Sequence, residues 1–157
     1  MAKQIRVFLD TNVLVSGFAT RGLSADVVRL LLAEHELLTG EVVLEETRRV
    51  LTEKFGVPKG KADEIERLLR RRHVESIPDA GLPVEGRDPD DEVVLASAIA
   101  AEAEILVTGD SDLLDVADEV DALRIMTPRT FWEEVRQLKK ACRRQSGEEG
   151  HSAYFGD

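Results

Sequence analysis

The sequence predicts an α/β protein: a three-layer α/β/α sandwich with a parallel, Rossmann-like sheet. Short apolar and β-branched runs alternate with segments of helical periodicity along the chain. Strands separated by helices must run parallel, because a parallel pair needs a crossover connection. The 157 residues, 43% of them hydrophobic and 33% charged, suffice for one domain with its own core.

The first half of the chain contains two strong strand patterns and three helical ones. Residues 5–9 form an apolar run that stops at Asp10, which indicates a buried strand. Ser24 is the expected N-cap of an amphipathic helix over 25–32. The other elements expected in this half are a short strand at 35–39, helices at 41–55 and 61–72, and a weak strand at 74–77.

The second half opens with a loop rich in proline and glycine at 78–90, which is too short to be a domain linker. The next segment, 91–103, is apolar almost all round and therefore predicts a buried helix. The elements expected after it are a strand at 104–108, a short helix at 112–118, a strand at 123–126 and a helix at 128–140 that starts near Pro128. The composition beyond Arg143 predicts a mobile tail, so the expected organisation is one domain at 1–142 and a tail at 143–157.

Composition and charge restrict the classes of function. The net charge is −10, and the two halves differ: residues 1–73 carry 13 basic against 11 acidic residues, and residues 74–157 carry 8 against 20. Nucleic-acid affinity comes from neutralising phosphates, so any such role needs a local basic surface or bound cations. Aromatic residues are 4% of the chain, which disfavours a base-stacking platform.

Cysteine content and hydropathy indicate a reduced environment. The one cysteine, Cys142, excludes a disulfide framework and a cysteine-based zinc site. No apolar run approaches 18 residues, and the chain opens directly into a strand pattern rather than a signal peptide. We expect a cytoplasmic protein with no membrane association.

Two aspartates directly follow predicted strands. Asp10 ends the first strand, and Asp110 follows the strand at 104–108. In open parallel sheets, ligands bind beyond the carboxyl ends of the strands, at the point where strand order reverses. The simpler explanation is that each aspartate only caps the next helix. Two carboxylates side by side are unfavourable without a compensating cation, so the pair favours a cation site.

Helix geometry adds two more carboxylates. Glu46 shares its helix face with valines three and four residues away, so it lies in the apolar stripe, whereas Glu45 is flanked by arginines at those spacings, which predicts solvated ion pairs. A glutamate on a buried face is costly unless it is paired or binds metal; exposure at the edge of the stripe is the alternative. Asp91 opens the apolar helix with Val94 on its own face, although acids also favour any helix start.

Oxygen ligands of this kind suit Mg²⁺ or Mn²⁺. The histidines at 35, 73 and 151 lack the spacing of a metal site, which disfavours zinc as the ion. A divalent ion held by carboxylates is the usual apparatus for hydrolysing phosphodiesters. The candidate ligands are Asp10, Glu46, Asp91 and Asp110.

Four motifs in this order resemble PIN-domain proteins, and within them the branch of toxin components of toxin–antitoxin systems. They are FLDTN at 8–12, the segment of Glu46 ending in VL at 50–51, DPDD at 88–91 and VTGDSDLL at 107–114, and the resemblance spans residues 4–138. It implies a Mg²⁺- or Mn²⁺-dependent ribonuclease that cuts single-stranded RNA, with an antitoxin partner and a homodimeric assembly. It also implies ligand roles for the four carboxylates, an auxiliary role for Asp112, and supporting hydrogen bonds from Thr11, Asn12, Thr108 and Ser111.

Basic residues supply candidate RNA contacts: Arg48, Arg49, Lys54, Lys59, Lys61 and the run Arg70, Arg71 and Arg72. The alternative for that run is a solvated helix end, where cations favour the dipole. The consecutive leucines 30–32 span about 200° of a helix at roughly 100° per residue, which is wider than one sheet face requires. The surplus apolar edge needs a cover, either the helix at 61–72 or a second copy of the chain.

Other functions remain open at this level. A receiver-like signalling domain also gathers acids around Mg²⁺, but the motifs here contain no lysine. A phosphatase of the haloacid dehalogenase type would need a second aspartate two residues after Asp10, where Asn12 stands. A catalytically idle PIN-fold binding module is the third alternative, and the presence of all four acids disfavours it.

Overall fold

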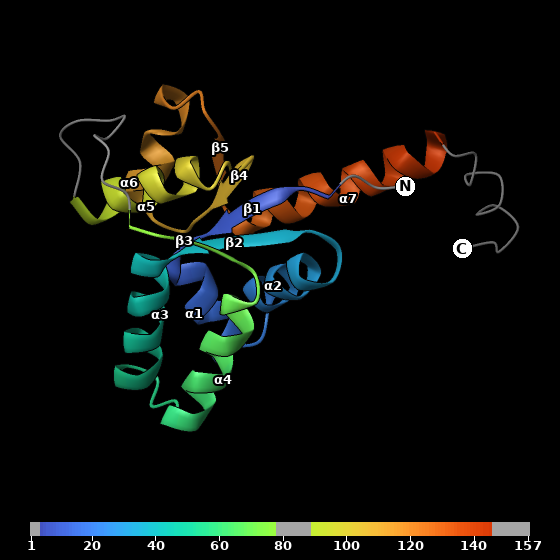
Figure 1. Ribbon diagram of the computed structural model, residues 1–157. Coiled ribbons are helices and arrows are strands. Elements are labelled where there is room, and N and C mark those ends of the chain that lie inside the picture. Colours follow the sequence, from blue (N-terminus) through green and yellow to red (C-terminus); the bar gives the residue numbers. More distant parts are fainter. Residues whose placement is uncertain (1–3, 78–88, 146–157) are drawn as a thin grey trace, which may run out of the picture.

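The computed structural model describes residues 4–77 and 89–145. Five parallel strands form one sheet in the order β3-β2-β1-β4-β5 (Figure 1). The strands are β1 Arg6–Leu9, β2 Glu36–Gly40, β3 His73–Glu75, β4 Ile105–Val107 and β5 Arg124–Met126. The chain builds outward from β1 to β3, returns to β4 beside β1, and continues to β5. Strand order therefore reverses between β1 and β4.

Helices cover both faces of the sheet, which confirms the predicted three-layer α/β fold. Figure 1 shows α1 to α4 on one side of the sheet and α5 and α6 on the other. The helices are α1 Thr11–Ala19, α2 Leu23–Glu34, α3 Glu41–Glu53, α4 Lys59–Arg70, α5 Pro89–Ala100, α6 Ser111–Asp115, the 3₁₀ helix η1 Ala117–Glu119 and α7 Pro128–Gln145. The short helix predicted at 112–118 is thus two elements, α6 and η1.

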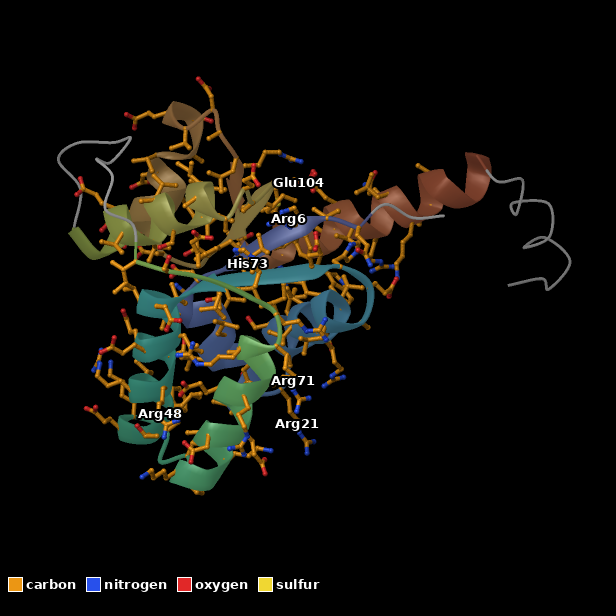
Figure 2. All side chains as sticks on the ribbon, viewed as in Figure 1. Arg6, Arg21, Arg48, Arg71, His73 and Glu104 are labelled. Atoms are coloured by element: carbon orange, nitrogen blue, oxygen red, sulfur yellow. The ribbon has the colours of Figure 1, made fainter. Side chains whose placement is uncertain are left out.

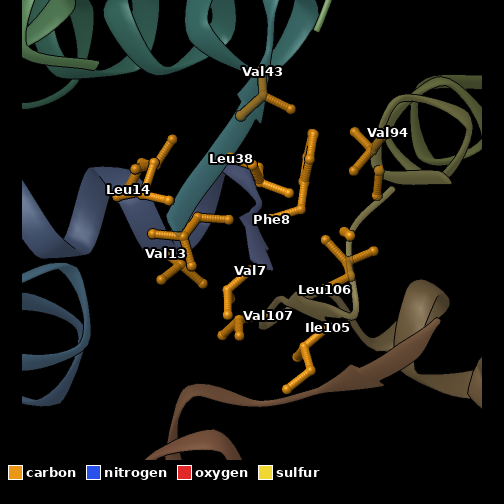
Figure 3. Close-up of a cluster of buried hydrophobic side chains, with 14 of the residues drawn as sticks. Val7, Phe8, Val13, Leu14, Leu38, Val43, Val94, Ile105, Leu106 and Val107 are labelled. Atoms are coloured by element: carbon orange, nitrogen blue, oxygen red, sulfur yellow. The ribbon is translucent and has the colours of Figure 1, made fainter. Parts of the chain in front are cut away.

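The core lies around β1, the central strand. Val7, Phe8 and Leu9 are fully buried, since β1 is paired on both edges and covered on both faces. Figure 3 shows side chains of β1, β2 and β4 meeting those of α1, α3 and α5, Val43 and Val94 among them. This packing fixes the carboxyl ends of β1 and β4 next to one another.

The start of the second helix differs from the prediction. Gly22, and not Ser24, is the N-cap of α2, and it makes no side-chain capping bond. Its backbone φ of 137° lies in a region that residues other than glycine rarely adopt, so glycine lets the chain turn sharply between α1 and α2. The helix begins at Leu23 as a result. The sequence analysis also assigns no element to residues 11–19, which form α1.

The apolar edge of α2 is covered within the chain. Leu31 is fully buried, and Leu30 and Leu32 are partly buried against the core. The helix packs on α1, β2 and α7. The cover thus includes α7, which the sequence analysis did not consider, and the leucine pattern no longer argues for a second copy. The homodimer itself stays a prediction.

Two predicted segments fall partly outside the described residues. Helix α7 continues to Gln145, so the predicted tail shares its first three residues with that helix. The rest of the tail, at 146–157, and residues 78–88 of the predicted loop lie beyond the described part of the chain. In residues 4–77 and 89–145, no helix combines the length and apolar character needed to cross a membrane.

Candidate metal centre

Asp10 and Asp110 occupy equivalent places at the carboxyl ends of β1 and β4. Each caps the helix that follows: Asp10 Oδ1 accepts a hydrogen bond from the Thr11 backbone N–H (2.8 Å), and Asp110 Oδ1 accepts one from the Asp112 N–H (2.9 Å). The capping explanation is therefore correct for both residues. It does not exclude a ligand role, because a carboxylate has acceptor capacity for several partners.

A hydrogen-bond frame joins the two strand ends. The Thr108 hydroxyl donates to Asp10 Oδ2 (2.7 Å) and accepts from the Asp110 N–H (3.0 Å). The Asn12 amide donates to the same Asp10 oxygen (3.3 Å), and its carbonyl oxygen accepts from the Gly109 N–H (2.8 Å). Thr108 and Asn12 thus hold Asp10 and Asp110 in a fixed relation, as supporting residues would.

The electrostatics of Asp10 are unfavourable in the absence of a cation. Its side chain is buried, and burial is the main cause that raises the pKa of its carboxyl above 3.8. The nearby charge of Asp110 raises this pKa further, while the hydrogen bonds from Thr108, Thr11 and Asn12 lower it. The ionised carboxylate is therefore only partly compensated by the protein itself.

Glu46 and Asp91 reach the same place from two helices. They are partly exposed, whereas Glu45 is exposed, so the helix face assigned to Glu46 is supported. The two carboxylates help to line a cleft of about 560 Å³ at the carboxyl edge of the sheet. Its lining consists of Asp10, Thr11, Asn12, Val15, Ser16, Glu46, Val50, Lys54, Phe55, Asp91, Val94, Asp110 and Asp112.

Three of these carboxylates fit a single cation. Asp91, Asp110 and Asp112 each offer an oxygen, and the three oxygens lie within 4.8 Å of one another. An all-oxygen donor set with this net negative charge suits Mg²⁺ or Mn²⁺. Asp112, expected as an auxiliary acid of the metal site, belongs to this group. Ser111, predicted as a supporting residue, is exposed and does not belong to the described residues that line the cleft.

The basic candidates for RNA contact are distributed unevenly. Lys54 lines the cleft. Arg48 instead joins α3 to α4 through Asp63 (2.6 Å) and Glu66 (3.0 Å), which corrects the expectation that it flanks Glu45 as an ion pair. Arg72 donates to a backbone carbonyl of α2, and Arg70 pairs with acids of α3 and α4. The remaining candidates, Arg49, Lys59, Lys61 and Arg71, are exposed, and Lys61 lies 3.9 Å from Glu64.

Sequence reasoning missed the apolar part of the cleft. Phe55 and Val15, which the helix-face arguments do not reach, share its lining with the acids. The available signal was the position of Phe55, which directly follows Lys54 at the end of the helix and precedes Gly56. Because the residues on both sides of Phe55 are polar or glycine, the sequence gives no sign that its ring belongs to the core.

The fold and the cleft define a class: an α/β domain whose parallel sheet carries an oxygen-rich, acidic site where strand order reverses. The family model described as PIN domain matches residues 6–112, from β1 to the start of α6. This range contains all five acids of the cleft, and Asp112 is its last residue. The chain belongs to the PIN-domain family. No curated protein matches the chain.

Solved structures share this fold. One is a chain in the crystal structure of VapBC2 from Rickettsia felis bound to a DNA fragment from their promoter: TM-score 0.52, 18% identity, covering 76% of this chain and 96% of that one. Another is Mycobacterium tuberculosis VapC20, a sarcin-ricin loop cleaving toxin: TM-score 0.51, 19% identity, covering 75% of this chain and 98% of that one. At these identities the likeness concerns the fold.

Proposed function

We propose that this protein is a divalent-metal-dependent endoribonuclease that cuts single-stranded RNA and acts as the toxin of a toxin–antitoxin pair. One observation carries the catalytic part: five carboxylates line one cleft of a PIN-domain chain. Two of them follow β1 and β4, and the others lie on α3, α5 and α6. Such a cleft repels an RNA phosphate unless cations are bound in it, so a metal ion has to take part in substrate binding.

The residues divide the work by position. Asp91, Asp110 and Asp112 would hold Mg²⁺ or Mn²⁺, and Asp10 and Glu46, in the same cleft, would complete the ligand set. When bound, the ion lowers the pKa of a water and polarises the scissile phosphate. Thr108 and Asn12 keep Asp10 oriented toward this place. Water attacks phosphorus and the P–O3′ bond breaks, which leaves a 5′-phosphate and a 3′-hydroxyl.

The deciding experiment is cleavage of an unstructured, 3′-labelled RNA by the full chain in Mn²⁺ or Mg²⁺. We expect cleavage that stops when EDTA is added, and products that a 5′-phosphate-dependent exonuclease degrades. An Asp110→Asn variant purified in parallel controls for contaminating nucleases. Absence of cleavage with both metals would refute the nuclease, and cleavage that persists in EDTA would refute the metal dependence.

Strand order argues against the receiver-like alternative. Receiver domains follow the flavodoxin-like order 2-1-3-4-5. The order here is 3-2-1-4-5, with β1 rather than β3 at the centre. The idle binding module stays a competing proposal, and the same assay addresses it: a chain that binds RNA in Mn²⁺ without cutting it would favour that reading.

The toxin role rests on the resemblance and on likeness to two structures whose descriptions name VapBC2 and a toxin. We expect growth arrest when the chain is produced from an inducible promoter, and relief when a small reading frame directly upstream is produced with it. Arrest by the Asp110→Asn variant would show a cause other than cleavage. Sedimentation at micromolar concentration tests the predicted homodimer, and a monomer would refute it.

A further inference from the structure

Phe55 is exposed and yet belongs to the acidic cleft. Half of its surface is accessible, and its side chain lines the cleft together with the carboxylates. The other aromatic residues of the described part of the chain contact the core: Phe8 and Phe131 are fully buried, and Phe18 and Trp132 are partly buried against it. A single exposed apolar residue is ordinary on a surface, so its place in the cleft is the informative observation.

The backbone holds Phe55 in a defined position. Its N–H bonds to the Val50 carbonyl (3.4 Å), and the next residue, Gly56, has a φ of 64°. This left-handed residue reverses the chain after α3, and the Val57 N–H then bonds to the Leu51 carbonyl (3.0 Å). Val57 packs against the core. The ring therefore stands at the cleft on an anchored turn.

Lys54, the residue before it, brings a cation to the same lining. It is exposed and C-caps α3, and no ion pair to it is found among the residues that the structure describes. Arg48, nearly two turns earlier, is by contrast engaged with two acids of α4. The ammonium of Lys54 is thus available to an anion in the cleft, although five carboxylates stand nearby.

An aromatic face beside a cation is the combination that proteins use for unpaired nucleotides. Bases of any identity stack on the ring, and the cation follows the phosphates. A duplex offers no free base face, so one stacking residue favours single strands. The low aromatic content disfavours a platform of several rings, but it does not exclude a single ring at the place where the strand is cut.

We propose that Phe55 stacks on an unpaired base of the substrate while Lys54 binds an adjacent phosphate, which makes this corner the part of the cleft that selects single-stranded RNA. The proposal rests on the proposed ribonuclease function for its substrate, but its test measures binding alone.

The test measures the affinity of a fluorescent 12-nucleotide single-stranded RNA by anisotropy. The full chain carries Glu46→Gln and the buffer contains Mn²⁺, so that the probe survives. We expect Phe55→Ala and Phe55→Leu to weaken binding by about 10- to 100-fold and Phe55→Trp to preserve it, since stacking on a base needs a planar ring. The matched control is Leu138→Ala, which trims an equally exposed apolar side chain on α7 and leaves binding unchanged.

A second probe identifies the contact. In a set of RNAs, each carries one abasic nucleotide at a different position. At one of these positions, the affinity of the parent chain should fall as far as the Phe55→Ala variant's affinity falls for the intact RNA. For that abasic RNA, the Phe55→Ala substitution should cause no further loss. Lys54→Gln should reduce the salt dependence, log Kd against log [salt], by about 0.7, the value for one phosphate of a single strand. Lys140→Gln, at an exposed lysine of α7 outside the lining, should leave this slope unchanged.

The outcomes separate this inference from the nuclease proposal. Cleavage by the wild-type chain together with equal RNA affinity of Phe55→Ala and its parent would overturn the stacking role and leave the nuclease intact. Absence of cleavage together with the expected losses would retain the stacking role in a binding module. Equal binding of duplex and single-stranded RNA, or no binding of the single strand, would overturn the inference directly.

Discussion

The two faces of α3 handle negative charge in different ways. Toward α4, the acids Glu41, Asp63 and Glu66 are bridged by Arg48 and Arg70 at 2.6–3.0 Å (Figure 2, where Arg48 is labelled). Toward the sheet, Glu46 joins four aspartates in a cleft whose lining contains one basic residue, Lys54. The protein balances charge within itself where acids hold helices together. In the cleft, five carboxylates share the lining with a single lysine, and in the proposed function a bound cation supplies the remaining positive charge.

The largest effect that tests this contrast is on cleavage. Glu46→Gln keeps the shape of the side chain and removes a charge from the cleft, so we expect cleavage to fall by about 10²–10³-fold, the loss seen when one transition-state contact is removed. Glu45→Gln alters an exposed neighbour on the same helix and should leave the rate within about twofold. The measurement is the cleavage rate of both variants and the wild type, determined in parallel in Mn²⁺. Equal losses in the two variants would mean that Glu46 has no special place in the cleft.

The next effect is on thermal stability. An ion that binds only the folded chain stabilises it by about 2.7 kcal/mol at a concentration 100-fold above its Kd. For a chain of this size, that corresponds to a rise in Tm of about 5–10 °C. Millimolar Mn²⁺ should produce this shift in the wild type and in Arg48→Gln, but not in Asp110→Asn, as measured by calorimetry. A wild-type Tm that is the same with and without Mn²⁺ would contradict the metal centre.

A smaller effect concerns Asp10. Burial, assisted by the charge of Asp110, raises the pKa of this carboxyl in the folded state. The folded state therefore favours the neutral form, and the stability contributed by that form is lost as pH rises through the raised pKa. Asp10→Asn should stabilise the metal-free protein by about 1 kcal/mol at pH 7 while abolishing cleavage.

The pH dependence distinguishes this cause from better packing. The stability gap between Asp10→Asn and wild type should open as pH rises above 3.8, the ordinary pKa of the group, and reach a plateau above the raised value. Denaturant titrations without metal, from acidic to neutral pH, measure the gap. A gap that is independent of pH would assign the stabilisation to the amide itself.

The smallest effect lies on the opposite face of α3. Arg48→Gln should lower the Tm slightly at low salt, and 1 M NaCl should shrink the difference, because ion pairs of partly exposed groups are screened. Arg49→Gln, on an exposed neighbour, is the control. Unchanged stability combined with weaker RNA binding would instead support the predicted RNA contact of Arg48.

The order of strands and helices could be predicted because it depends on local alternation. The strand-end position of Asp10 and Asp110 follows from the same pattern, and the helix face of Glu46 follows from spacing. Helix α1 escaped assignment because its apolar residues, Val13 to Val15, are consecutive and show no polar face. The N-cap at Gly22 depends on a backbone angle that no residue pattern prescribes.

Contacts between distant segments were beyond the sequence. The partners of Arg48 lie 15 and 18 residues away on another helix, so the spacing within α3 suggested the wrong neighbour. Asp112 joins Asp91 because α5 and α6 pack together, which only the folded chain reveals. Phe55 reaches the cleft through the turn at Gly56. The low overall aromatic content gave no indication that one aromatic residue lies at the site.

The central place of β1 has a consequence for biosynthesis. During translation, β1 can pair on one edge with β2, the next strand in the chain, but its other edge has to wait for β4. A nascent chain that ends at residue 77 already contains Asp10 and Glu46, yet it lacks the carboxylates of α5 and α6 and the Thr108 hydroxyl that orients Asp10. The cleft therefore forms only after Asp112 has been translated and is free to fold, and no nascent chain that ends before this residue can present all five acids.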